Sequence, residues 1–343
     1  MSVSFMDSFD HYTALAGANG KYASAGLSSA IVSGPQRTGT ACLQVISAAF
    51  GPYRAIPPTT DVLIASAYYM SGGTPAWCYE LGNSGANAGS SGIAGLYING
   101  DGSLAAGQPW FPGPAKLFAS TVPGLFQFNS YNMLGFRVTG FHTLNTRFRI
   151  WCNGVLVLDQ SGFDTKTGAA GPDFCNGFEL FGAGGNATTC YHDDLYVLDC
   201  TSAPNNNYLG ALRIYASVPV ANGAVAWTPL AGTNWQNVDT IPPTGTPYNS
   251  SVMPGQVDQY LHPLPGAVPS NSTLFAVQHC QDLQAVGGSR SVTSDIAGVS
   301  NAGAVALSFG FLIDTWPYDI NPATAAPWLA SDFPLLAGPA VTA

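Results

Sequence analysis

The chain has 343 residues and a formal net charge of −9, from 10 basic and 19 acidic residues. Its hydrophobic fraction of 46% is enough to bury a core in each of two domains. The basic residues are scattered, which argues against a nucleic-acid-binding protein, because such proteins cluster their positive charge. The longest nearly apolar run, residues 304–313, is half the length of a membrane-spanning helix, so membrane insertion is not expected.

Breaker residues and scarce charge favour strands over helices. The chain contains 40 Gly and 25 Pro, and only 8% of its residues are charged. Glu occurs only at Glu80 and Glu179, so the chain has too few charged, helix-favouring residues to form exposed helices with a charged face. We therefore predict an all-β protein of many short strands joined by turns. Its uncharged polar surface suits contact with neighbouring subunits or sugars, although a neutral soluble surface is the simpler alternative.

The most specific local pattern is a β-hairpin over residues 147–158. A buried strand is expected before it, over residues 61–70, which are dense in apolar and aromatic side chains. Residues 147–152 alternate between apolar and polar positions, and Asn153-Gly154 supplies the two residues that a tight turn requires. Residues 155–158 then form the returning strand.

A polar stretch after the next predicted strand marks the domain boundary. Residues 191–198 are predicted to form a strand, and Ser, Pro and Asn follow it. We place the first domain at residues 1–203 and a smaller β-rich domain at residues 204–343. A strand over residues 209–216 is expected to open the second domain.

Seven cysteines occur, without a Cys-x-x-Cys pair or a zinc-type spacing to histidine. Reduced, buried thiols that act as small hydrophobic residues are the prediction. A disulfide among Cys175, Cys190 and Cys200 is the alternative.

Several segments together resemble a family of tailed-bacteriophage minor virion proteins with a concanavalin-like (laminin-G-like) jelly roll. The opening residues 5–12 are similar to that family's first strand, and residues 147–158 to its hairpin. Residues 192–199 are similar to the strand that ends its first domain, and residues 314–328 to its closing stretch. The resemblance covers nearly the whole chain. It implies a concanavalin-like jelly-roll sandwich followed by a second β-rich domain that mediates assembly.

The same resemblance implies a structural component of the virion, such as a decoration protein, fibre or spike, and not an enzyme. The expected partners are copies of the chain, with a trimer as the common arrangement, and other virion proteins. A carbohydrate-binding module that attaches the particle to a host glycan is the alternative function. A polysaccharide hydrolase is a third hypothesis. The sequence does not place the chain on head, neck or tail.

The carboxylates do not predict a hydrolase. Lectin-fold glycosidases need two carboxylates on either side of the scissile bond, and Glu80 and Glu179 lie far apart in the chain. Asp193 and Asp194 are adjacent, so on a regular strand their side chains point to opposite faces and do not act as a pair. A Gly-x-Ser-x-Gly nucleophile motif does not occur.

No cofactor is required by these patterns, but structural calcium is a hypothesis. The first and last strands of a jelly roll commonly lie side by side, which would bring Asp7 or Asp10 close to Asp193 or Asp194. In the alternative, these aspartates cap turns or accept backbone hydrogen bonds without a metal.

Aromatic and arginine side chains are the candidates for sugar or subunit contact. Trp151 shares one face of its predicted strand with Arg147 and Arg149, which is an unusual set for a core. Trp77 and Trp110 are further candidates, because a flat indole ring stacks on a sugar ring. The alternative is a solvent-facing strand with cation–π packing.

Overall fold

Strands make up nearly all the regular structure in a computed structural model of the chain. It describes residues 3–10, 21–22, 29–46, 51–82, 92–109, 116–165, 173–182, 189–240, 246–286, 290–307 and 312–342. Helices in these ranges are limited to two 3₁₀ turns, η3 (Asn234–Asn237) and η4 (Ala330–Asp332). None of the described helices is long and apolar enough to cross a membrane. The prediction of an all-β protein is confirmed.

The chain forms two compact units. The N-terminal unit comprises residues 1–9, 14–16 and 22–214, and the C-terminal unit comprises residues 10–13, 17–21 and 215–343. Residues 204–214, which the sequence assigns to the second domain, therefore belong to the N-terminal unit.

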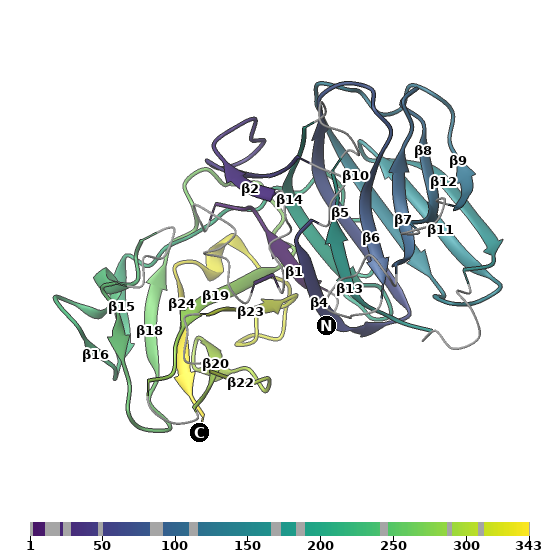
Figure 1. The fold of residues 1–343 in the computed structure, drawn as a ribbon. Coiled ribbons are helices and arrows are strands. Elements are labelled where there is room, and N and C mark those ends of the chain that lie inside the picture. Colours follow the sequence, from purple (N-terminus) through teal and green to yellow (C-terminus); the bar gives the residue numbers. More distant parts are fainter. Residues whose placement is uncertain are drawn as a thin grey trace. The chain divides into compact units, whose positions relative to one another are not determined.

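The N-terminal unit is a concanavalin-like jelly roll of two antiparallel sheets (Figure 1). The first sheet has the order β12-β11-β10-β5-β14-β3-β2, and β1 also pairs with β14. Its strands are β1 (Val3–Asp7), β2 (Ser29–Val32), β3 (Cys42–Val45), β5 (Asp61–Met70), β10 (Tyr131–Thr139), β11 (Thr146–Cys152), β12 (Val155–Phe163) and β14 (Cys190–Asp199). The second sheet has the order β4-β13-β6-β7-β8-β9. Its strands are β4 (Tyr53–Thr59), β6 (Ala76–Gly82), β7 (Gly92–Ile98), β8 (Leu104–Gln108), β9 (Lys116–Ser120) and β13 (Cys175–Leu180).

Side chains from both sheets meet in a buried core between them. The hydroxyl of Tyr79 on β6 lies 2.7 Å from that of Ser66 on β5, and the rings of Phe118 on β9 and Phe148 on β11 stack at 5.7 Å. Burial of large aromatic side chains on both inner faces is the main stabilising term in such a sandwich. All seven cysteines are free thiols, of which six are buried and Cys280 is half-buried.

The predicted hairpin is confirmed. β11 and β12 pair from Cys152 and Val155 outward, and the turn residues Asn153 and Gly154 have φ angles of 50° and 87°. The Asn153 side chain also accepts a hydrogen bond from the amide of Met133 at 2.9 Å, which ties the turn to β10. The left-handed conformation that the turn requires is thus supplied by Asn and Gly.

The C-terminal unit contains one antiparallel sheet, whose strands differ in length, and two separate strand pairs. The sheet has the order β15-β18-β24-β20-β21, and β22 also pairs with β20. β16 pairs with β17, and β19 with β23. The strands are β15 (Ala221–Val225), β16 (Thr228–Pro229), β17 (Asn249–Ser250), β18 (Asp258–His262), β19 (Val277–Leu283), β20 (Ser291–Ile296), β21 (Val299–Ser300), β22 (Val305–Ala306), β23 (Leu312–Tyr318) and β24 (Leu335–Val341).

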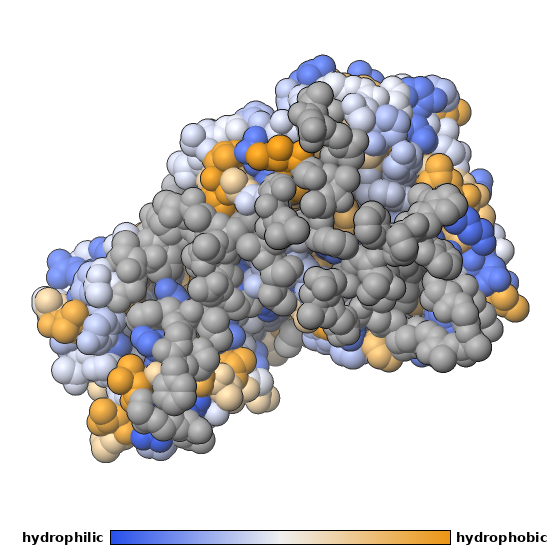
Figure 2. Space-filling model, in the orientation of Figure 1, coloured by the Kyte–Doolittle hydropathy of each residue, from blue (hydrophilic) through white to orange (hydrophobic). Residues whose placement is uncertain are grey.

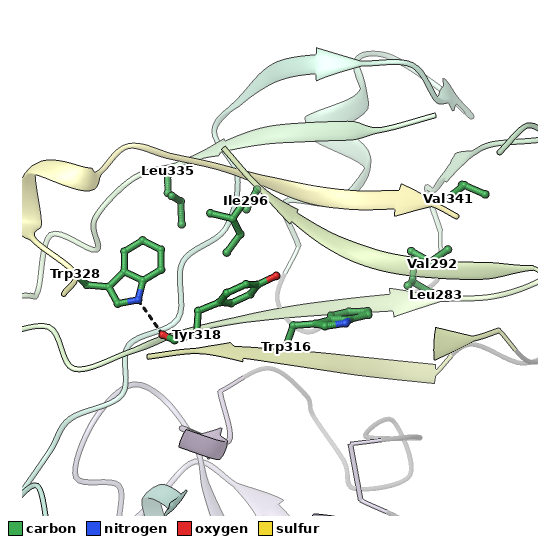
Figure 3. Close-up of a cluster of buried hydrophobic side chains, with 9 residues drawn as sticks. Leu283, Val292, Ile296, Trp316, Tyr318, Trp328, Leu335 and Val341 are labelled. Atoms are coloured by element: carbon green, nitrogen blue, oxygen red, sulfur yellow. Dashed lines mark hydrogen bonds between the residues drawn. The ribbon is translucent and has the colours of Figure 1, made fainter. Parts of the chain in front are cut away.

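Its core lies between the sheet and the β19–β23 pair (Figure 3). Trp316 and Tyr318 on β23 face Val292 and Ile296 on β20, and the indole nitrogen of Trp328 donates a 2.8 Å hydrogen bond to the carbonyl of Tyr318. This bond satisfies the one polar group that the buried indole carries. The C-terminal unit therefore has a hydrophobic core of its own.

The predicted strand over residues 209–216 is wrong. No strand lies between β14 and β15, because the backbone of this segment bonds to side chains and not to a neighbouring strand. The Arg37 guanidinium donates to the carbonyl of Leu212 at 2.7 Å, and the amide of Ile214 donates to the Asp194 carboxylate at 2.8 Å. Apolar content alone did not reveal these side-chain partners.

Candidate functional site

One row of residues crosses the outer face of the six-stranded sheet. It consists of directly paired positions on five neighbouring strands, and we name it the carboxyl row: Tyr53 (β4), Glu179 (β13), Glu80 (β6), Gly95 (β7) and Gly107 (β8). Paired residues on neighbouring strands share a face of the sheet. The row faces outward because the adjacent residue of β6, Tyr79, points into the core.

The ring of Trp77 covers the glycine end of the row, and Tyr97 lies beside it. A Cβ atom on Gly95 would lie 2.8 Å from Cε3 of Trp77, and one on Gly107 would lie 3.0 Å from its Cη2 atom. The indole therefore lies over both glycines, and the ring of Tyr97 is 5.0 Å from it. Only glycine leaves room for the indole to lie this close to the backbone. Gly95, Gly107 and the half-buried ring of Trp77 therefore form one flat surface, which we call the platform.

Glu179 and Glu80 lie opposite each other in the centre of the row. Their side chains are 1% and 2% exposed, and they are direct partners in the β13–β6 ladder. Burial raises the pKa of Glu179 to about 8. The nearby amide of Gly51 has the opposite, smaller effect, although it does not form a hydrogen bond with the carboxyl group. Burial and the neighbouring Glu179 raise the pKa of Glu80 well above its ordinary value. The two carboxyl groups therefore favour their protonated forms.

The sequence did not reveal this pair. The two glutamates are far apart in the chain, and the strand pairing that joins them depends on the long-range register of β6 and β13. One signal was available, since these are the only glutamates in a chain with few charges and each lies inside an apolar strand segment.

Trp151, Arg147 and Arg149 lie on the outer face of the other sheet, as their alternation predicted. Trp151 is only 8% exposed, because Tyr208 stacks on it at 5.1 Å with an interplanar angle of 16°. The Arg147 guanidinium forms an ion pair with Asp159. The structure thus separates this trio from Trp77, which lies on the opposite sheet, and Trp110 lies outside the described residues.

The prediction that Asp193 and Asp194 point to opposite faces is wrong. A β-bulge interrupts the β14–β5 pairing after Asp193, and Asp194 has a φ angle of 50°. Both carboxylates consequently bind the same segment: Asp193 accepts from the amides of Arg37 and Thr38, and Asp194 accepts from their side chains. Burial, followed by the neighbouring Asp194, raises the pKa of Asp193 to about 7.

The carboxylates that were candidates for calcium have protein partners. β1 and β14 do lie side by side, but the Asp7 carboxylate accepts hydrogen bonds from the amide of Phe9 and the hydroxyl of Tyr22. Asp10 belongs to the C-terminal unit. Among the described residues, no three His, Cys, Asp or Glu side chains are grouped as they would be around a metal ion. Asp7, Asp193 and Asp194 thus accept hydrogen bonds from the protein itself, at a turn and at a bulge.

His192 is a buried neutral base in the core of the jelly roll. Its Nε2 atom lies 3.0 Å from the carbonyl of Phe181, its Nδ1 atom lies 3.3 Å from the Ser66 hydroxyl, and burial lowers its pKa to about 4. Between about pH 6.5 and pH 4 the unfolded chain binds a proton that the folded chain excludes. The His192 contribution to stability is therefore complete above pH 6.5 and is lost as the pH falls, by about 2 kcal/mol at pH 5.

Urea unfolding at about pH 7 and pH 5 measures this contribution. The loss of stability between the two pH values should be smaller by about 2 kcal/mol in His192→Phe than in the native chain. An equal loss in both proteins would show that His192 does not titrate in this way.

Comparisons with known proteins do not assign the chain to a family. No family model matches it, and no curated protein matches it. An alginate lyase, Aly36B, in complex with alginate trisaccharide is 16% identical with a TM-score of 0.38, over 57% of this chain and 97% of that chain. A galectin from Cinachyrella sp. is 14% identical with a TM-score of 0.30, over 42% of this chain and 95% of that chain. A glucuronan lyase from Trichoderma reesei is 12% identical with a TM-score of 0.34, over 50% and 86%. Scores of this size do not transfer any activity or ligand to this chain.

Proposed function

We propose that this chain is a non-enzymatic structural protein of a tailed-phage particle and that its C-terminal unit forms contacts between subunits. The observation that carries the proposal is the surface of that unit, which combines very little charge with many exposed apolar side chains. The similarity of the sequence to phage minor virion proteins supports the same function.

Charge is nearly absent from residues 215–343. They contain one basic residue, Arg290, and seven aspartates without any glutamate. Three of these aspartates, Asp258, Asp295 and Asp319, are buried. A surface with so few ions is weakly hydrated, so covering it costs little desolvation free energy.

Exposed apolar side chains are concentrated in the same unit. Of the seventeen large hydrophobic side chains that are exposed among the described residues, eleven lie in it: Val220, Val225, Leu230, Val238, Tyr248, Val252, Met253, Val286, Val299, Ile320 and Leu329. Figure 2 shows patches of apolar atoms at the left and lower edges of this unit. Exposed apolar area of this kind favours association with another protein surface. Copies of the same chain are the proposed partner, because a structural virion protein is present in many copies.

Mass spectrometry of purified phage particles tests the assignment. The chain should be present in a fixed ratio to the major head protein, and the ratio should survive a density-gradient step that removes loosely bound host proteins. Particles that infect normally but lack the chain would exclude a structural function.

A second function, glycan binding, is favoured by the platform of Trp77 on Gly95 and Gly107. One face of the ring is fixed by the glycines, and the ring retains exposed area for stacking on a sugar. The neighbouring Tyr97 extends the aromatic surface. Binding to a host glycan is compatible with a structural function in the particle.

A glycan array probed with the native chain and with Trp77→Ala tests this function. Binding that the native chain shows and Trp77→Ala loses would support it, and Tyr248→Ala, which removes an exposed ring from the C-terminal unit, serves as the matched control. Equal binding by all three proteins, or none by the native chain, would contradict it. Release of reducing ends from a bound polysaccharide would instead indicate a hydrolase.

A further inference from the structure

Glu80 and Glu179 are placed where two negative charges repel each other most. They are direct partners in antiparallel strands, so their Cβ atoms lie about 5 Å apart on one face of the sheet. Like charges at such positions destabilise a sheet, and burial increases the repulsion because the surroundings screen it poorly. A pair of this kind needs a neutralising partner.

Within the described part of the chain, no side chain provides one. Both carboxylate oxygens of Glu179 and the Oε1 atom of Glu80 are buried without a hydrogen-bond partner. The nearest arginine along the neighbouring strand, Arg54 of β4, lies over the ring of Phe5 in the core and so on the other side of the sheet. Buried carboxylates in this state cost several kcal/mol unless they are paired, coordinated or protonated.

We propose that Glu80 and Glu179 bind one hard divalent cation of the calcium type. The available donors are carboxylate oxygens, which hard cations prefer over transition metals with nitrogen or sulfur ligands. A cation between the two side chains neutralises both charges and satisfies the three unpartnered oxygens together. Water or backbone carbonyls complete its coordination shell, as is usual for calcium.

The burial of the pair favours an ion over a larger ligand. With exposures of 1% and 2%, the two carboxyl groups offer no surface on which a sugar ring could rest. A neutral sugar would also leave the repulsion between the two charges in place. The sugar platform at Trp77 and the cation site at the glutamates are thus separate parts of one face.

Terbium luminescence of the full-length chain tests the site directly. Tb³⁺ replaces Ca²⁺ at oxygen sites, and the rings of Trp77 and Tyr53 lie on the same face for energy transfer to it. At about pH 8, where carboxylates ionise more readily, we expect sensitised emission that saturates at one ion per chain and is displaced by Ca²⁺. Glu80→Gln and Glu179→Gln should each weaken binding about tenfold or more.

Asp193→Asn is the matched control, because it removes a buried carboxylate that already has protein partners. It should leave terbium binding unchanged, and circular dichroism verifies that all three variants fold. The proposal is overturned if the native chain gives no saturable emission, or if the emission survives in both glutamine variants. Either result would leave a shared proton as the neutralising partner.

Discussion

Replacing Asp258 with alanine is expected to destabilise the C-terminal unit by about 4 kcal/mol. The side chain is fully buried, and its Oδ1 atom accepts hydrogen bonds from the amides of Ala226 and Trp227 at 2.9 and 3.0 Å. Its Oδ2 atom accepts from the Asn234 side chain and the Tyr260 hydroxyl. Alanine removes the shared acceptor of these four donors, two of which belong to the buried side chains Asn234 and Tyr260, and this is more costly than the loss of apolar contact.

Urea unfolding combined with hydrogen exchange measures the effect, because exchange assigns the loss of stability to peptides of residues 215–342. Asp239→Ala is the matched control: Asp239 is half-buried and, among the described residues, accepts a hydrogen bond only from its neighbour Thr240, so the change should stay within about 0.5 kcal/mol. A similar small effect for Asp258→Ala would show that the carboxylate does not organise the unit.

Asp194→Ala is expected to cost the N-terminal unit about 3 kcal/mol and to release the segment that leads to the C-terminal unit. Asp194 accepts from Arg37 at 2.7 Å, from the Thr38 hydroxyl at 2.9 Å and from the amide of Ile214 at 2.8 Å. Its side chain is 0% exposed, so alanine removes a buried acceptor that Arg37, Thr38 and Ile214 share and breaks the ion pair with Arg37. Limited proteolysis should then cut within residues 205–214.

The Arg147–Asp159 ion pair provides the contrast. Its distance of 2.6 Å is close to the 2.7 Å of the Arg37–Asp194 pair, but the side chains are 45% and 32% exposed, so water and salt screen it. Arg147→Ala should therefore cost no more than about 1 kcal/mol and leave residues 205–214 resistant to protease. If the two variants lose equal stability, burial is not what distinguishes these ion pairs.

Local patterns in the sequence predicted the parts of the fold that depend on neighbouring residues. The alternation of residues 147–152 and the Asn153-Gly154 turn were sufficient for the hairpin, because its register is set by the turn itself. The strand at residues 61–70 followed from its density of apolar side chains.

Features that depend on long-range pairing could not be predicted. The contact of Glu80 with Glu179 requires the register of β6 against β13, and the shared target of Asp193 and Asp194 requires a bulge in β14. Residues 209–216 have the composition of a strand, yet side chains from distant parts of the chain hold their backbone. In each case tertiary contacts decide the outcome and the local sequence does not.

Sedimentation velocity of the full chain over a range of micromolar concentrations tests the central claim, that the C-terminal unit assembles copies of the protein. We predict a species whose mass is a multiple of 35.5 kDa. A double change to lysine at Val252 and Met253, which are 76% and 57% exposed, should reduce the mass to that of one chain. A single change to lysine at Val122, which lies in the N-terminal unit and is 66% exposed, should leave the assembly intact. A native chain that sediments at 35.5 kDa at every concentration would contradict the account.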